Sequence, residues 1–119
     1  MKYNIIQEKS FDFSVRIVNL YKFLANDKKE FVLSKQVLRS GTSIGANIEE
    51  AIGSFSENEF IFKLQIAYKE SRETIYWLKL IYKTDYINEE QFNSIIKDAN
   101  EICKILTKII ITKKNKIKQ

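Results

Sequence analysis

The amino-acid sequence predicts an all-α protein, a four-helix bundle. Proline is absent from the 119 residues and glycine occurs only three times, so the residues that most often interrupt helices are nearly missing. Hydrophobic residues make up 45% of the chain, which is ordinary for a globular domain. They recur at steps of three and four residues in four segments, and this spacing places side chains on one face of a helix. The length suits a single domain, residues 1–119.

The first expected helix spans about residues 10–26, with Ser10 as its N-cap. Apolar residues follow one face from Phe11, and a neighbouring face begins at Phe13. Residues 27–30 are all charged, which predicts a short connection.

The second expected helix spans about residues 34–54 and begins at Ser34 as its N-cap. Gly41 and Gly45 lie four residues apart on one face of it, although each interior glycine costs about 1 kcal/mol relative to alanine. Close approach of another helix would offset this cost. We therefore expect the small central residues of the third helix to face the two glycines.

A polar stripe runs beside the apolar seam of this second helix. It is either a solvated flank or a row of interhelical hydrogen bonds beside the core. The stripe consists of Arg39 or Ser40, Ser43, Asn47, Glu50 and Ser54.

The third expected helix spans about residues 56–84 and has the clearest start signal in the chain. Ser56 as N-cap and Glu59 three residues later form a capping box. This helix carries more apolar surface than one core-facing stripe requires: Ile61, Phe62, Ile66, Tyr68, Ile75, Tyr76, Trp77, Leu80 and Tyr82. The excess either forms contacts between subunits or wraps the edges of the core.

The fourth expected helix spans about residues 88–112, with Asn88 as N-cap and Gln91 three residues later. Cys103 falls on its apolar seam, which predicts a core thiol rather than a nucleophile. A basic tail, residues 113–119, is expected to follow the helix.

The positive charge of the chain is concentrated near its C-terminal end. Residues 1–103 carry 14 Lys or Arg against 15 Asp or Glu, whereas residues 104–119 carry six lysines and no acid. These lysines either offset the dipole at the end of a helix or form a basic arm that binds the phosphates of RNA or DNA. They are Lys104, Lys108, Lys113, Lys114, Lys116 and Lys118.

The composition argues against an enzyme. The chain has no histidine and one cysteine, which excludes the usual zinc sites and Cys-His nucleophiles. Glu70 and Glu73 share a side of the third helix, but a di-iron bundle would need Glu-x-x-His pairs. We expect no catalytic residue, no metal and no cofactor. No apolar run approaches the ~20 residues of a membrane span, so the expected location is the cytoplasm, without a membrane partner.

Several motifs resemble those of a known family. They are residues 38–51 (LRSGTSIGANIEEA) and, on the third helix, Lys69, Glu70, Glu73 and the run Tyr76, Trp77 and Leu78. Over about residues 9–110 the chain resembles the bacterial four-helix-bundle proteins encoded in intervening sequences of large-subunit ribosomal RNA genes. That resemblance implies an antiparallel up-down bundle that assembles into a ring-like homo-oligomer, such as a homopentamer, and no established reaction. The fold is also similar to the accessory variability protein of retroelements, a basic pentameric barrel that binds nucleic acid and a reverse transcriptase.

Two functions follow from these observations. The first is an oligomeric, nucleic-acid-associated binding module that uses the basic C-terminal end. The second is a structural or adaptor oligomer that docks a protein partner without binding nucleic acid. In either case we expect a set of polar and aromatic residues to fix helix register and subunit packing: Arg39, Ser43, Asn47, Glu50, Lys69, Glu70, Arg72, Glu73, Tyr76 and Trp77.

Overall fold

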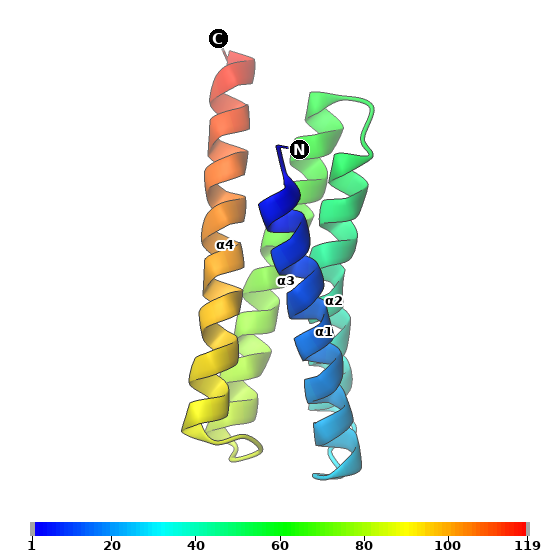
Figure 1. Cartoon of the computed structure of the whole chain (residues 1–119), viewed down its shortest axis with the longest axis vertical. Helices are drawn as coiled ribbons and strands as arrows, with labels where there is room; N and C mark the ends of the chain where they lie inside the picture. Colours follow the sequence, from blue (N-terminus) through cyan, green and yellow to red (C-terminus); the bar gives the residue numbers. More distant parts are fainter. Residues whose placement is uncertain (1, 119) are drawn as a thin grey trace.

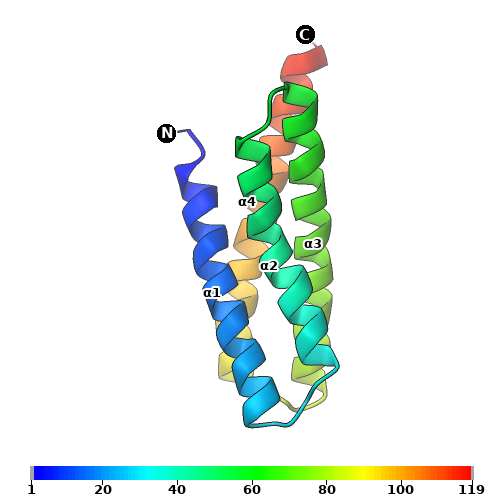
Figure 2. The same cartoon turned by 90° about the vertical axis from the view of Figure 1, so that its right-hand side faces the viewer.

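The computed structural model describes residues 2–118, which form four helices and no strand. The helices are α1 (Asn4–Asn26), α2 (Leu33–Ile52), α3 (Glu57–Lys83) and α4 (Glu89–Lys118). They lie side by side in a rod of 51 × 22 × 21 Å (Figure 1). Both ends of the chain and the α2–α3 connection lie at one end of the rod, and the other two connections lie at the opposite end (Figure 2). The prediction of an all-α protein is confirmed.

Helix α1 begins at Asn4, so the prediction that Ser10 caps it is wrong. Ser10 is a buried residue inside the helix, and its hydroxyl donates to the carbonyl oxygen of Gln7 at 3.1 Å. Tyr3 precedes the helix and makes no capping hydrogen bond through its side chain. The early start brings Ile6 into the core, so tertiary burial rather than a local cap extends the helix.

Helix α2 is capped by Glu30 and not by Ser34. The Glu30 carboxylate accepts hydrogen bonds from the backbone N–H groups of Ser34 at 2.8 Å and Val32 at 3.1 Å. Burial alone would raise the pKa of Glu30, but hydrogen bonds from the N–H groups of residues 32–34 outweigh it and lower that pKa. The buried Ser34 hydroxyl donates to the carbonyl oxygen of Glu30 at 2.7 Å. The sequence did not reveal this cap because the carboxylate reaches forward from the connection.

The N-caps predicted for α3 and α4 are confirmed, and α4 has the complete capping box. At α3 the Glu59 carboxylate accepts from the backbone N–H of Phe55 at 3.5 Å and not from that of Ser56. The Ser56 hydroxyl accepts a hydrogen bond from the backbone N–H of Glu59 at 3.1 Å. Asn88 and Gln91 satisfy each other's backbone N–H groups, at 2.8 and 2.9 Å. These two starts are local properties of the chain, so the sequence alone was sufficient to place them.

Helix α4 continues to Lys118, so its expected end at residue 112 is too early and residues 113–118 are not a separate tail. Lysine is a good helix former, and cations near a helix C-terminus interact favourably with the helix dipole. Gln119, the last residue of the expected tail, lies outside the described residues.

The core lies between the four helices, and its largest fully buried side chains include Phe13, Ile17, Ile44, Leu64, Leu78, Ile102 and Leu106. Cys103 is only half-buried, at the edge of the core, so the prediction of a core thiol is wrong. It lies one residue beyond the buried Ile102, and this rotation turns it toward the α3–α4 surface.

The two central glycines face α1, so the prediction that they face α3 is wrong. A methyl group at Gly41 would lie 2.7 Å from Cγ1 of Ile17, and one at Gly45 would lie 3.3 Å from Oγ of Ser14. Contact between α2 and α3 uses a neighbouring side of α2, where Ser40 Oγ lies 2.9 Å from Thr74 Oγ1 in the core. Small residues of α2 therefore lie at both of these helix contacts: glycine faces α1, and serine faces α3.

Four of the nine surplus apolar side chains of α3 pack against the edges of the core. Tyr68, Ile75, Trp77 and Tyr82 are partly buried against it. The large apolar residues that remain exposed are spread over several elements: Ile5, Phe11, Val15, Phe31, Val32, Phe55, Phe62, Tyr76, Ile111 and Ile117. Among residues 2–118, no helix is both long and apolar enough to cross a membrane.

Candidate functional site

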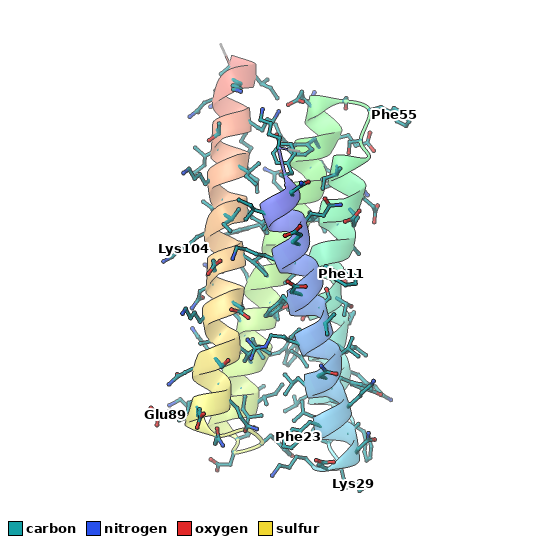
Figure 3. The ribbon with its side chains drawn as sticks, in the orientation of Figure 1. Phe11, Phe23, Lys29, Phe55, Glu89 and Lys104 are labelled. Carbon is teal, nitrogen blue, oxygen red and sulfur yellow. The ribbon has the colours of Figure 1, made fainter. Side chains whose placement is uncertain are left out.

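Two stripes of exposed residues follow the outer sides of α3 and α4. The α3 stripe consists of Lys69, Arg72, Tyr76, Lys79 and Lys83. The α4 stripe consists of Lys97, Asn100, Lys104, Lys108, Ile111, Asn115 and Lys118. Steps of three and four residues place each stripe on one side of its helix, and neither contains a carboxylate. We call their cations the basic face: Lys69, Arg72, Lys79, Lys83, Lys97, Lys104, Lys108 and Lys118. Figure 3 shows Lys104 projecting away from the bundle.

The carboxylates in the middle of α3 and α4 point instead toward α1 and α2. Glu70 and Glu73 of α3 both pair with Arg39 of α2, the first at 3.3 Å. On α4, Asp98 pairs with Arg16 of α1 at 2.6 Å, and Glu101 pairs with Lys9. In the middle of α3 and α4 the fold therefore separates the charges: these acids turn inward to the other two helices, and the bases of the two stripes turn outward.

No cation of the basic face is in an ion pair with a residue of the described part of the chain. Unpaired charges of one sign on one surface raise the local potential and attract an oppositely charged ligand. The face is suited to binding a polyanion.

The six C-terminal lysines do not act as one group. Lys104, Lys108 and Lys118 belong to the basic face, and Lys114 adjoins it beside Phe62. Lys116 is exposed on another side of α4, since two residues are about 200° apart on a helix. The α4 lysines therefore contribute part of a face that also includes α3.

Lys113 of α4 contacts the start of α3 at one end of the bundle. Its side chain is only 15% exposed and pairs with Glu57 at 2.9 Å, while its Nζ lies 5.4 Å from the centre of the Phe60 ring. The hydrogen bond to Glu57 raises the pKa of Lys113 above its ordinary value. The geometry thus favours a structural role for this lysine over phosphate binding.

The polar stripe of α2 is partly interhelical and partly local. Arg39 and Glu50 reach α3, where Glu50 pairs with Lys63 at 2.9 Å. Ser43 and Asn47 instead donate hydrogen bonds to carbonyl oxygens of their own helix, at 2.7 and 2.8 Å. Each of the two interpretations of this stripe therefore describes some of its residues. Exposed ion pairs contribute about 0–1 kcal/mol each, so the interhelical pairs contribute more to register than to stability.

Four further residues of α3 were expected to fix helix register and subunit packing, and they lie on two different sides of that helix. Trp77 lies on the side of α3 that faces Arg39, because its indole N–H donates to Glu73 at 2.9 Å and Glu73 pairs with Arg39. Lys69 and Arg72 belong to the basic face, and Tyr76 lies on the same exposed stripe of α3.

A pocket of about 480 Å³ opens where the two stripes meet. The described residues that line it include three cations and no carboxylate: Arg72, Ile75, Tyr76, Lys79, Asn100, Cys103 and Lys104. Sequence reasoning missed this site, although the spacing of the α3 cations was visible in the sequence. Among residues 2–118, no three His, Cys, Asp or Glu side chains are grouped so that they could hold a metal ion.

Comparison with known proteins identifies the family. The family described as 23S rRNA-intervening sequence protein matches residues 2–108. The chain belongs to this family. A crystal structure of a protein with unknown function, from the S23 ribosomal protein family of Bacteroides thetaiotaomicron, is 60% identical in sequence with a TM-score of 0.90. The match covers 92% of this chain and 98% of that one. No curated protein matches the chain.

The resemblance seen in the sequence to the 23S rRNA-intervening sequence family is therefore confirmed. All cations of the basic face except Lys118 lie within the matched residues. Most of the C-terminal lysines, from Lys113 onward, lie beyond them.

Proposed function

We propose that this protein is a non-enzymatic module that binds nucleic acid through the basic face. The observation that carries the proposal is the separation of charge on α3 and α4. The carboxylates Glu70, Glu73, Asp98 and Glu101 are held by cations of α1 and α2, and the outward cations have no such partner among the described residues. Lys and Arg that neutralise phosphates release counterions, and this release drives binding.

The dimensions of the face fit an extended polyanion. From Lys97 to Lys118, α4 presents cations over about 30 Å at 1.5 Å per residue, and α3 adds a parallel row. Successive phosphates of one DNA strand are about 3.4 Å apart along a duplex, so several can face the cations at once.

A matched pair of double variants tests the proposal. Lys79→Gln/Lys104→Gln removes two charges from the basic face, whereas Lys22→Gln/Lys35→Gln removes two exposed charges from α1 and α2. Binding of fluorescently labelled RNA and DNA is measured by anisotropy between about 50 and 200 mM salt. We expect the first variant to lose about tenfold in affinity, with a salt slope lower by about two, and the second to bind as the unmodified protein does.

Two outcomes would contradict the proposal. One is the absence of any complex at about 50 mM salt, where phosphate contacts are strongest. The other is an equal loss in both double variants, because it would show that net charge matters and the location of the charge does not.

A second candidate function is a structural or adaptor oligomer in which antiparallel up-down bundles assemble into a ring. The Lys113–Glu57 pair joins the end of α4 to the start of α3 and supports the antiparallel order. The apolar residues Phe11 and Val15, four apart on α1, are exposed and offer a surface for a second copy. Assembly is compatible with the first function, because repeating the basic face in each subunit would raise affinity by avidity.

A further inference from the structure

We infer that the pocket in the basic face receives an unpaired nucleobase, so that the preferred ligand is single-stranded nucleic acid. This inference rests on the proposed function and adds to it the class of ligand. Four features of the pocket support it: an exposed aromatic ring, the packing that holds that ring, an amide group, and flanking cations.

Tyr76 provides a stacking surface at the pocket. Its ring contacts Trp77 edge to face, with centroids 5.1 Å apart and planes at 73°. Trp77 is itself held by its hydrogen bond to Glu73. Tyr76 nevertheless remains 58% exposed, so packing orients the ring without covering it. An oriented, exposed aromatic ring can stack any base, since every base has a π-face.

The rest of the pocket matches the other parts of a nucleotide. Asn100 carries an amide, which can both donate to and accept from the edge of a base. Ile75 and Cys103 supply apolar surface, and the volume of about 480 Å³ falls within the range of about 300–1,000 Å³ typical of small-ligand pockets.

The cations around the pocket are placed for the backbone of a strand. Arg72 and Lys79 come from α3 and Lys104 from α4, so charge flanks the pocket on both sides. A strand lying between the two helices would contact these cations with its phosphates while one base enters the pocket. Such a binding mode joins a positive groove to an aromatic platform, the combination found in proteins that bind single strands.

A duplex fits this pocket less well than a single strand. Its bases are paired and stacked, and extruding one requires breaking that pairing and stacking, whereas the bases of a single strand are already accessible. A duplex would therefore contact the cations of the basic face without using Tyr76.

The test compares a labelled oligothymidylate of about 16 nucleotides with a duplex of equal length, by anisotropy at one salt concentration. Tyr76→Ala should weaken single-strand binding about tenfold and leave duplex binding unchanged. Tyr76→Phe keeps the ring and should bind as the unmodified protein does. Phe31→Ala removes an exposed ring from the α1–α2 connection, which lies outside the basic face, and should also have no effect.

Cys103 supplies an independent readout, because it is the only cysteine and lines the pocket. The single strand should slow its alkylation by iodoacetamide severalfold, and the duplex should not.

The results separate the inference from the proposed function. If both probes bind equally and Tyr76→Ala changes neither affinity, the nucleobase site is wrong and the basic face remains. If polyglutamate slows alkylation of Cys103 as strongly as the oligothymidylate does, the pocket is a general anion site and the inference is overturned. If neither nucleic acid binds, the proposed function fails and the nucleobase site fails with it.

Discussion

Gly41 and Gly53 belong to the same segment of the chain and differ in what surrounds them. A methyl group at Gly41 would lie 2.7 to 3.0 Å from three carbon atoms of Ile17, a fully buried side chain of α1. At Gly53, which follows α2 with φ −83°, the nearest atoms would be 3.7 and 3.8 Å away. Only the first position requires the absence of a side chain.

We predict that Gly41→Ala destabilises the protein by up to about 2 kcal/mol. Overpacking the contact with Ile17 costs about 1–3 kcal/mol, and the better helix propensity of alanine offsets about 1 kcal/mol of this cost. Urea unfolding followed by circular dichroism measures the change. Gly53→Ala is the control and should lie within about 0.5 kcal/mol of the unmodified protein. Equal stability of the two variants would show that α1 and α2 do not approach closely at Gly41.

Glu30 makes the start of α2 dependent on pH. Its pKa is lowered in the folded state, so the stability that its ionised form contributes is present above the ordinary glutamate value of about 4.3 and is lost as the pH falls through the lower folded value. Glu30→Gln keeps an acceptor oxygen and removes the charge, so it should cost about 0.3–1 kcal/mol at pH 7, the typical contribution of a carboxylate at a helix N-terminus.

Thermal unfolding of both proteins at several pH values measures this difference. It should shrink below about pH 4, where the carboxylate of the unmodified protein becomes protonated. A difference that stays constant from pH 7 to pH 3 would rule out the carboxylate as the cap.

At the scale of elements, α2 and α3 are joined by one buried pair of hydroxyl groups. Thr74 Oγ1 lies 2.9 Å from Ser40 Oγ and 2.7 Å from the carbonyl oxygen of Glu70. Both side chains are fully buried, so each hydroxyl depends on the other, or on its own helix, for a partner.

We predict that Thr74→Val and Ser40→Ala are coupled. Thr74→Val should cost about 1–3 kcal/mol because it deprives the Ser40 hydroxyl of its interhelical partner, whereas the double variant should cost less than the sum of the single ones. Unfolding of the four proteins in a double-mutant cycle measures the coupling. Strict additivity would mean that the two hydroxyl groups contribute independently.

The four helix starts show which boundaries a sequence can predict. Ser56 and Asn88 cap α3 and α4 through residues three positions away, so the signal is complete within one turn. The start of α1 depends on burial of Ile6, and the cap of α2 comes from a carboxylate in the preceding connection. The first has no local signature, and the second is local but uses a glutamate, which is not one of the preferred N-cap residues Ser, Thr, Asp and Asn.

At the scale of the whole molecule, the exposed apolar residues of α1 allow a prediction about assembly. If Phe11 and Val15 form a contact between subunits, Phe11→Glu should reduce the mass in solution to that of one chain, because a charge cannot be buried there without a partner. Light scattering after size-exclusion chromatography measures that mass. Phe31→Glu, in the α1–α2 connection, is the control and should leave the assembly intact. An unmodified protein that stays a single chain would refute this contact.

The basic face also belongs to this scale. Counted along the chain, residues 1–103 are nearly neutral, and the sequence therefore directed attention to the C-terminal lysines. In the structure, Lys113 is held by Glu57, while Lys69, Arg72, Lys79 and Lys83 of α3 join the lysines of α4. A count along the sequence averages over opposite sides of a helix, and only the packing decides which side meets another helix.

By itself, the sequence determined the helical class, the starts of α3 and α4, and the family, because periodicity, capping boxes and motifs are short-range properties of the chain. Only the tertiary structure decided that Gly41 faces α1, that the acids of α3 and α4 pair with α1 and α2, and that Arg72, Tyr76 and Lys104 border one pocket. These are contacts between residues far apart in the chain. They depend on how each helix is rotated about its axis, and that rotation is set by all four helices packing together.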